Sequence, residues 1–106
     1  MKKTLILAAA IALAPVAVLA DEAPAGEALA QKNGCLACHA VDKKIVGPSY
    51  KEVATKYRAD KDAQAKLEKK VKQGGQGVWG AIPMPPNGAA SDADIKSLVK
   101  WILSLK

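Results

Sequence analysis

The chain has no phenylalanine and only one histidine, and its aromatic residues are two tryptophans and two tyrosines among 106 positions. A domain this small has little apolar side-chain volume with which to fill a core, and small folds commonly recruit disulfides or metals. With so few aromatic rings, a bound group rather than side chains is expected to occupy the centre of the fold. The single histidine also excludes a site that takes two imidazoles from one chain.

The sequence also lacks an apolar run of ordinary membrane-spanning length. Residues 5–20 give 16 positions, fewer than the ~20 that a spanning helix needs, and Pro15 interrupts them. Two lysines precede this run, small side chains end it and two acidic residues follow, which is typical of a secretory signal peptide. We expect residues 1–20 to be cleaved and residues 21–106 to form one exported domain without stable membrane insertion. An uncleaved anchor is the alternative.

Helical spacing of apolar residues predicts four helices, and no stretch alternates long enough for a strand. The clearest helix begins after Ser91, an N-cap followed by acidic residues, and runs towards the end of the chain. The others are expected at about residues 26–33, 50–58 and 63–73, the last ended by two glycines. Residues 74–87 hold four glycines and three prolines, and therefore form a loop. The predicted fold class is all-α.

The residues Cys35-Leu36-Ala37-Cys38-His39 form a C-x-x-C-H motif, the arrangement of c-type haem attachment. Each thiol can add to one vinyl group of haem, and the imidazole of His39 then lies below the iron as its proximal ligand. One covalent haem c with its iron is the expected cofactor. The alternatives are a disulfide, a redox-active dithiol without its usual βαβ context, and a zinc site with fewer than the about four ligands it needs.

Met84 is the only methionine outside the predicted leader, and three nearby prolines stiffen the loop that carries it. A thioether is a weak donor to iron that benefits from being held in position, so the pattern predicts Met84 as the second axial ligand. Core packing is the plain alternative for a lone methionine. His/Met coordination raises the reduction potential and closes both axial positions, which favours electron transfer. The competing hypothesis is a haem enzyme or gas-binding protein from which Met84 is displaced.

Four further motifs follow in order: Gly47-Pro48, Gly77-Val78-Trp79-Gly80, Ile82-Pro83-Met84-Pro85-Pro86-Asn87 and Lys100-Trp101-Ile102-Leu103. With them, the chain resembles the small bacterial class I cytochromes c of the c-551/c-552 type. The resemblance implies four to five helices around one haem, with the terminal helices crossing beside it. It further implies a soluble, monomeric, periplasmic one-electron carrier of the respiratory chain that is not an enzyme.

The same resemblance implies roles for residues around the two axial ligands. The Pro48 carbonyl would accept a hydrogen bond from Nδ1–H of His39, which fixes the ring and makes it a better donor. Asn87 would orient Met84 or its loop. An ordinary turn at Pro48 and an ordinary loop residue at Asn87 are the plain alternatives.

Two more residues are implied to contact the haem propionates. The indole N–H of Trp79 would reach a propionate, with core packing as its alternative. Several relatives place an arginine near the propionates where this chain has Lys70. A lysine gives one compact charge rather than a planar fork, so the resemblance leaves the contact at Lys70 open.

Residues 21–106 carry 14 basic and 10 acidic side chains, a net charge of +4. The basic residues are interleaved with acids in an exported chain, which argues against nucleic-acid binding. Lys43 and Lys44 form either an ordinary solvated surface or a basic rim that steers acidic redox partners. Relatives serve nitrite reductases, cytochrome c peroxidases or terminal oxidases, and these are the candidate acceptors.

Overall fold

The computed structural model describes residues 22–106, so the predicted leader and the cleavage site lie outside the described residues. The described residues form the helices α1 (Glu22–Lys32), η1 (Cys35–Ala37, a 3-10 helix), α2 (Tyr50–Tyr57), α3 (Ala63–Gln73) and α4 (Asp92–Ser104). Over this part of the chain, β pairing is limited to two isolated bridges. The predicted all-α class is therefore confirmed.

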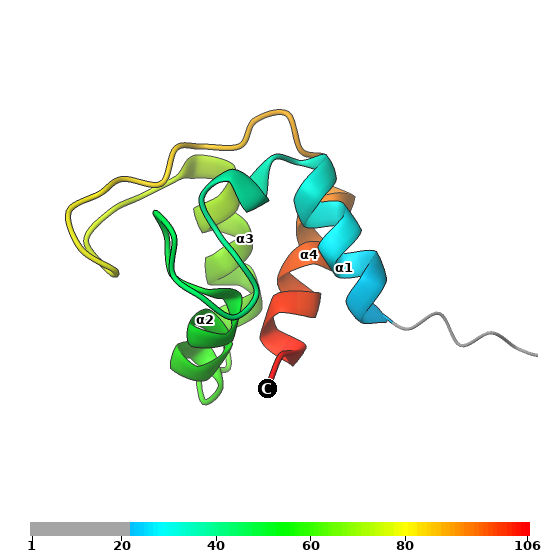
Figure 1. Cartoon of the computed structure of the whole chain (residues 1–106), viewed down its shortest axis with the longest axis horizontal. Helices are drawn as coiled ribbons and strands as arrows, with labels where there is room; N and C mark the ends of the chain where they lie inside the picture. Colours follow the sequence, from blue (N-terminus) through cyan, green and yellow to red (C-terminus); the bar gives the residue numbers. More distant parts are fainter. Residues whose placement is uncertain (1–21) are drawn as a thin grey trace, which may run out of the picture.

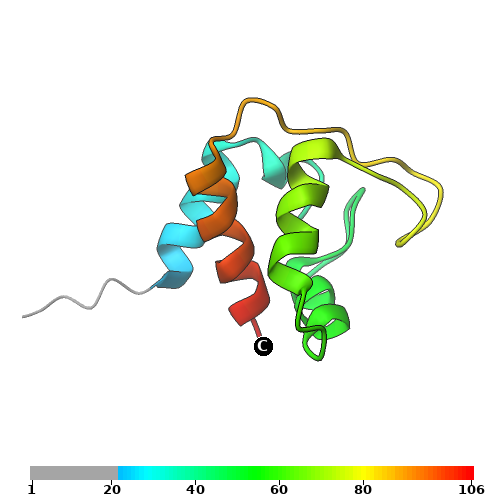
Figure 2. The same ribbon diagram turned by 180° about the vertical axis from the view of Figure 1, so that it is seen from behind.

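Helix α4 is the centre of the domain and packs against each of the other three α-helices. Figures 1 and 2 show α1 on one side of α4 and the α2–α3 pair on the other. The side chain of Ser91 accepts a hydrogen bond from the Asp94 amide at 3.1 Å, as predicted for an N-cap, a contact typically worth ~1 kcal/mol. The apolar face of α4 supplies five buried side chains: Ile95, Leu98, Val99, Trp101 and Ile102.

The other three α-helices were predicted in the right number, and two of them differ from the prediction at one end or both. Helix α3 has the predicted bounds, because Gly74 takes a φ of +72° just after it. Helix α2 begins as predicted behind a capping box of Ser49 and Glu52, and ends one residue early. Helix α1 begins at Glu22 rather than residue 26. Pro24 does not prevent this, because an amide in the first helical turn needs no partner within the helix.

Two loops lie on the same side of the helices. One follows η1 and leads into α2, and the other leaves α3, reaches outward and returns over the bundle to α4 (Figure 1). Neither loop contains regular structure beyond the isolated bridges His39 to Lys44 and Gly75 to Met84. None of the helices within residues 22–106 has both the length and the apolar character needed to cross a membrane.

Gly26 brings α1 close to α4. A Cβ added at Gly26 would overlap the indole ring of Trp101, which is buried on the facing side of α4. The missing side chain therefore allows the two helix axes to approach and the indole to fill the space between them. This contact supports the predicted crossing of the terminal helices.

Gly26→Ala is expected to lower the free energy of unfolding, although alanine alone would stabilise a helix by about 1 kcal/mol over glycine. The overlap with Trp101 should outweigh that gain, because overpacking typically costs 1–3 kcal/mol. Denaturant unfolding of the haem-loaded protein measures the difference. Gly88→Ala is the control, since nothing lies within 4 Å of a Cβ at that position. A Gly26→Ala protein as stable as the wild type would contradict this account of the helix crossing.

Candidate haem-binding site

A cavity of about 350 Å³ lies between the two loops and the faces of α2, α3 and α4. Six of the eight predicted site residues line it: Cys38, His39, Pro48, Lys70, Trp79 and Met84. The other two, Cys35 and Asn87, are not part of its lining. Cys35 packs against the hydrophobic core, and Asn87 is hydrogen-bonded elsewhere. Folding therefore brings together a nitrogen donor and a thioether that are far apart in the sequence.

The cysteines lie on a tight turn at the end of α1. Gly34 leaves the helix with a φ of +74°, a left-handed conformation that favours glycine. The amides of Cys38 and His39 then both donate to the Cys35 carbonyl, at 3.2 and 3.0 Å. Both thiols are free and half-buried. The turn thus fixes the backbone of the attachment motif without any disulfide between Cys35 and Cys38.

The imidazole of His39 is held by the chain that follows it. Its Nδ1 lies 2.8 Å from the Pro48 carbonyl. Because a carbonyl oxygen can only accept, Nδ1 carries the proton and Nε2 keeps the lone pair that a metal needs. Gly47 contacts the same ring, since a Cβ there would lie 2.5 Å from the His39 Cε1 atom. The residues of Gly47-Pro48 therefore set the position of His39 rather than forming only a turn.

Backbone hydrogen bonds tie Met84 to the end of α3. The amide of Gly75 donates to the Met84 carbonyl at 3.0 Å, and the Met84 amide donates to the Gly75 carbonyl at 2.7 Å. Gly74 lies under the same carbonyl, and a Cβ there would overlap it. Met84 is half-buried and packs against the core while it lines the cavity. The thioether is thus supported by the protein backbone itself.

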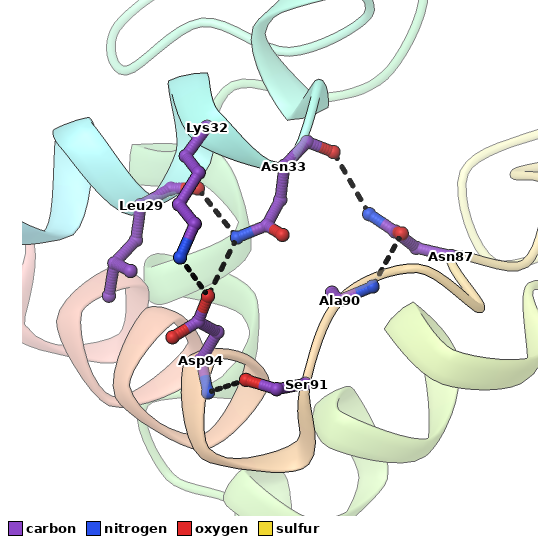
Figure 3. A network of polar contacts seen from close by, with 7 residues as sticks. All are labelled: Leu29, Lys32, Asn33, Asn87, Ala90, Ser91 and Asp94. Carbon is purple, nitrogen blue, oxygen red and sulfur yellow. Dashed lines mark hydrogen bonds and ion pairs between the residues drawn. The ribbon is translucent and has the colours of Figure 1, made fainter.

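Asn87 fixes the end of the Met84 loop. Its Nδ2 donates to the Asn33 carbonyl at 3.0 Å, and its Oδ1 accepts from the Ala90 amide at 3.2 Å (Figure 3). Its own amide donates to the Val71 carbonyl at 2.9 Å. No hydrogen bond joins Asn87 to Met84 among residues 22–106. Of the two implied roles for Asn87, these bonds fit the one in which it orients the loop.

Asn33 connects this loop to the crossing of α1 and α4. Its Nδ2 donates to the Leu29 carbonyl at 2.9 Å and lies 3.5 Å from Oδ2 of Asp94 (Figure 3). Lys32 forms an ion pair with the same carboxylate at 3.2 Å. These contacts, first that of Lys32 and then that of Asn33, hold the pKa of Asp94 below its usual value. One carboxylate therefore joins the end of α1 to the first turn of α4.

Trp79 and Lys70 lie at the edge of the cavity, and each has a contact with another segment of the chain. Trp79 is 44% exposed, so it does not pack in the core, and the ammonium of Lys56 lies 5.4 Å from its ring centroid. This cation–π contact joins α2 to the Met84 loop. Lys70 is half-buried in the last turn of α3, with its Nζ beside Gly75. Both side chains line the cavity where an anionic group could be held.

The residues present fit a haem. The cavity holds one imidazole with a free Nε2 and one thioether, both suited to haem iron, and much of its lining is apolar. A free thiol lies in the lining and a second one precedes it by three residues. The described residues hold no cluster of three or more His, Cys, Asp or Glu side chains suited to a metal ion. A helical domain with this motif and this cavity is a c-type cytochrome.

The comparisons with known proteins agree. A model of the family described as Cytochrome c matches residues 23–106. The chain is 56% identical to the cytochrome c-551 of Allochromatium vinosum over 87 residues, 82% of this chain and 93% of the relative. It is 48% identical to the cytochrome c-552 of Hydrogenobacter thermophilus over 106 residues, 100% of both chains. The crystal structure of Nitrosomonas europaea cytochrome c552 matches with a TM-score of 0.74 at 55% identity, covering 76% and 99%.

The chain therefore belongs to the cytochrome c family. Members of this family carry one covalently attached haem c, and this chain has the two cysteines for its attachment. They are electron carriers that exchange electrons with redox partner proteins. The resemblance to the c-551/c-552 type stated from the sequence is confirmed, as are the expected fold and cofactor.

Sequence reasoning missed three residues that the structure brings to the site. Asn33 connects the loop to the helix crossing, Lys56 covers the Trp79 ring, and the ring of Tyr50 is stacked on that of His39. The sequence predicted a helix from residue 50 but no contact between Tyr50 and His39. One signal was available, because Tyr50 follows Pro48, the residue implied to hold His39, by two positions.

Asp94→Asn is expected to lower the free energy of unfolding at neutral pH, because it removes the ion pair with Lys32. A carboxyl whose native pKa is depressed stabilises the fold above its unfolded pKa, and loses that contribution as the pH falls through the lower native value. The difference between wild type and variant should therefore shrink as the pH falls below 3.8, the usual value for aspartate, and vanish only below the lower native pKa of Asp94. Unfolding curves from pH 7 to pH 2 measure it. Asp42→Asn, at an exposed carboxylate, is the control, and a difference independent of pH would contradict the assignment.

Proposed function

We propose that this cytochrome is a diffusible, monomeric, periplasmic one-electron carrier and not an enzyme. One observation carries the proposal: the only histidine and the only methionine of residues 21–106 line the same cavity. A haem attached beside this pair has two axial donors from one chain. With both axial positions filled, a substrate would have to displace a ligand in order to reach the iron.

The proposed site assigns each donor from the contacts around it. Nε2 of His39 and the sulfur of Met84 would hold the iron, and the sulfurs of Cys35 and Cys38 would hold the porphyrin. The haem supplies the reversible gain and loss of one electron. Pro48 keeps the proton on Nδ1 of His39. Because both donor segments are fixed by backbone hydrogen bonds, the donors move little when the charge of the site changes.

The residues around the propionates form the next part of the proposal. Lys70 and Trp79 are at the cavity edge and offer an ammonium and an indole N–H to the two carboxylates. Lys56, over the Trp79 ring, brings a second positive charge to the same region. Asn87 acts through the loop end that it holds rather than through the iron ligand.

Export is proposed from the leader and from the relatives together. Residues 1–20 have the pattern of a cleaved signal peptide, which would release residues 21–106 into the periplasm. Covalent haem attachment through two thiols also suits a chain that leaves the reducing cytoplasm. The relatives named cytochrome c-551 and c-552 come from bacteria, which is consistent with this location.

Redox partners with acidic surfaces fit the exposed charge beside the site. Lys43 and Lys44 are exposed in the loop after His39, and Lys44 lines the cavity. We propose that they orient the haem edge towards an electron acceptor of the nitrite reductase, cytochrome c peroxidase or terminal oxidase kind. Nucleic acid is not proposed as a partner.

Met84→Ala is expected to lower the reduction potential by on the order of 0.1 V or more, within the roughly 0.8 V that axial ligands span. The variant should also lose the methionine-to-iron charge-transfer band and bind added imidazole or cyanide. Redox titration and ferric absorption spectra measure these changes. Ile82→Ala, in the same loop and without a donor atom, is the control. A wild type that is high-spin and lacks the band would instead support a haem enzyme or a gas-binding protein.

The rate of electron transfer to an acidic partner should fall as salt is added, because ions screen the attraction between exposed charges. Lys43→Gln/Lys44→Gln should lower the rate constant severalfold at low ionic strength and weaken its dependence on salt. Lys61→Gln/Lys100→Gln, which changes the net charge equally at exposed residues of other segments, should have a smaller effect. Stopped-flow measurement over a salt series tests this. Equal effects of the two double variants would contradict the proposal that Lys43 and Lys44 steer acidic partners.

A further inference from the structure

Tyr50 occupies a fixed place behind the attachment motif. It is the first residue of α2 and only 4% exposed. The capping box directly before it, in which Ser49 and Glu52 each bond the other's backbone amide at 3.1 Å, fixes where the helix begins. The Tyr50 amide also donates to the carbonyl of Ala40 at 2.9 Å, and the next amide to that of Val41 at 3.0 Å. The start of α2 is therefore bonded to the residues that follow His39.

The ring of Tyr50 lies against the imidazole of His39. The two ring centroids are 5.1 Å apart and the ring planes differ by 19°, which is a stacked arrangement. Trp101 meets the Tyr50 ring edge-on, at 5.7 Å and 79°. The Tyr50 ring thus has an aromatic partner on α4 as well as the imidazole, and it cannot move without disturbing the buried face of α4.

The hydroxyl of Tyr50 reaches the other end of the same motif. It lies beside the Cys35 side chain, and burial above all raises its pKa well above the usual value, so that it stays protonated. One side chain therefore contacts both the first residue of the attachment motif and the histidine that ends it.

The hydrogen bond to Pro48 leaves one motion of His39 unconstrained. A single bond at Nδ1 fixes the tautomer and the position of that edge, but the ring can still pivot about the bond direction. A second ring stacked nearly parallel to the imidazole opposes this pivot, because the offset or parallel contact is lost when either plane turns. Gly47 limits the same ring at Cε1 and Nδ1. Tyr50 supplies the aromatic contact with the face of the His39 imidazole.

We propose that Tyr50 is a positioning residue that sets the plane in which the His39 imidazole faces the haem iron. The inference rests on the proposed function, in which His39 is an axial ligand. The plane of an axial imidazole decides which iron d orbital overlaps its π system, and so determines how unpaired spin is distributed over a ferric haem. Replacing the Tyr50 ring should therefore change the spin distribution over the haem and leave the iron ligands the same.

A purely structural role predicts a different result. Tyr50 belongs to the hydrophobic core, and truncation of any core residue lowers stability. A core role alone would leave the orientation of His39 to Pro48 and Gly47. The stacked geometry is what favours positioning, and a measurement of ring orientation separates the two roles.

The test compares haem-loaded wild type, Tyr50→Phe and Tyr50→Leu in the ferric state. Proton NMR of the four haem methyl groups and EPR g values report the spin distribution. Tyr50→Phe keeps the stacked ring and should keep the wild-type order and spread of methyl shifts. Tyr50→Leu removes the stack and should change both, while its absorption spectrum stays low-spin. Leu98→Ala, at a buried residue outside the cavity lining, should lower the Tm and leave the shifts unchanged.

Each outcome decides between the roles. Wild-type shifts in Tyr50→Leu would overturn the proposal, and so would equal changes in Tyr50→Phe and Tyr50→Leu, because the hydroxyl rather than the ring would then be responsible. If Tyr50→Leu does not accumulate with haem, Tyr50→Met fills more of the same volume without a ring and carries the same expectation. Failure of the proposed function is distinct: the wild type itself would then lack the His/Met spectrum.

Discussion

The hydrogen bond from His39 to the Pro48 carbonyl is the contact around which the site is organised. It joins the end of the attachment motif to the residues just before α2. The two ends of the loop at residues 40–47 are therefore held together. Two backbone hydrogen bonds of the same segment accompany the bond to Pro48: the amide of Gly47 donates to the Cys38 carbonyl at 2.8 Å, and that of Tyr50 donates to the Ala40 carbonyl at 2.9 Å. With Nδ1 occupied in this way, Nε2 is the ring nitrogen left to bind a metal in the cavity. The loop of Met84 lines the same cavity.

Much of this could be predicted from the sequence, because the signals involved are local. The C-x-x-C-H motif specifies haem attachment by itself, and the N-cap at Ser91 and the glycines after Gln73 define helix ends within one turn. The start of α1 was predicted four residues too late, at residue 26, whereas the first turn of the helix includes Pro24. Local sequence signals were therefore sufficient to predict the helices and the two candidate iron ligands, His39 and Met84.

The contacts between elements could not be predicted in the same way. The stacking of Tyr50 on His39 and the cation–π contact of Lys56 with Trp79 depend on how α2 lies against two loops, and neither residue type requires such a partner. The role of Asn33 was hidden for a similar reason, because its partners Asn87 and Asp94 are 54 and 61 residues away. The sequence suggested that Asn87 orients the methionine or its loop, and its bonds run to the loop end. Tertiary packing selects one among several local possibilities.

The hydrogen bond between Asn33 and Asn87 has a further meaning for how the chain is divided. It closes a loop of chain that begins just before the attachment motif and ends with the last residue of the Met84 segment. Every predicted site residue from Cys35 to Asn87 lies within that closed loop or at its end, whereas α1 and α4 lie outside it, and α4 adds Val99 and Ile102 to the cavity lining. Lys106 is exposed and lies outside this loop, so a protein fused to it would leave the attachment motif and the Met84 segment uninterrupted inside the closed loop.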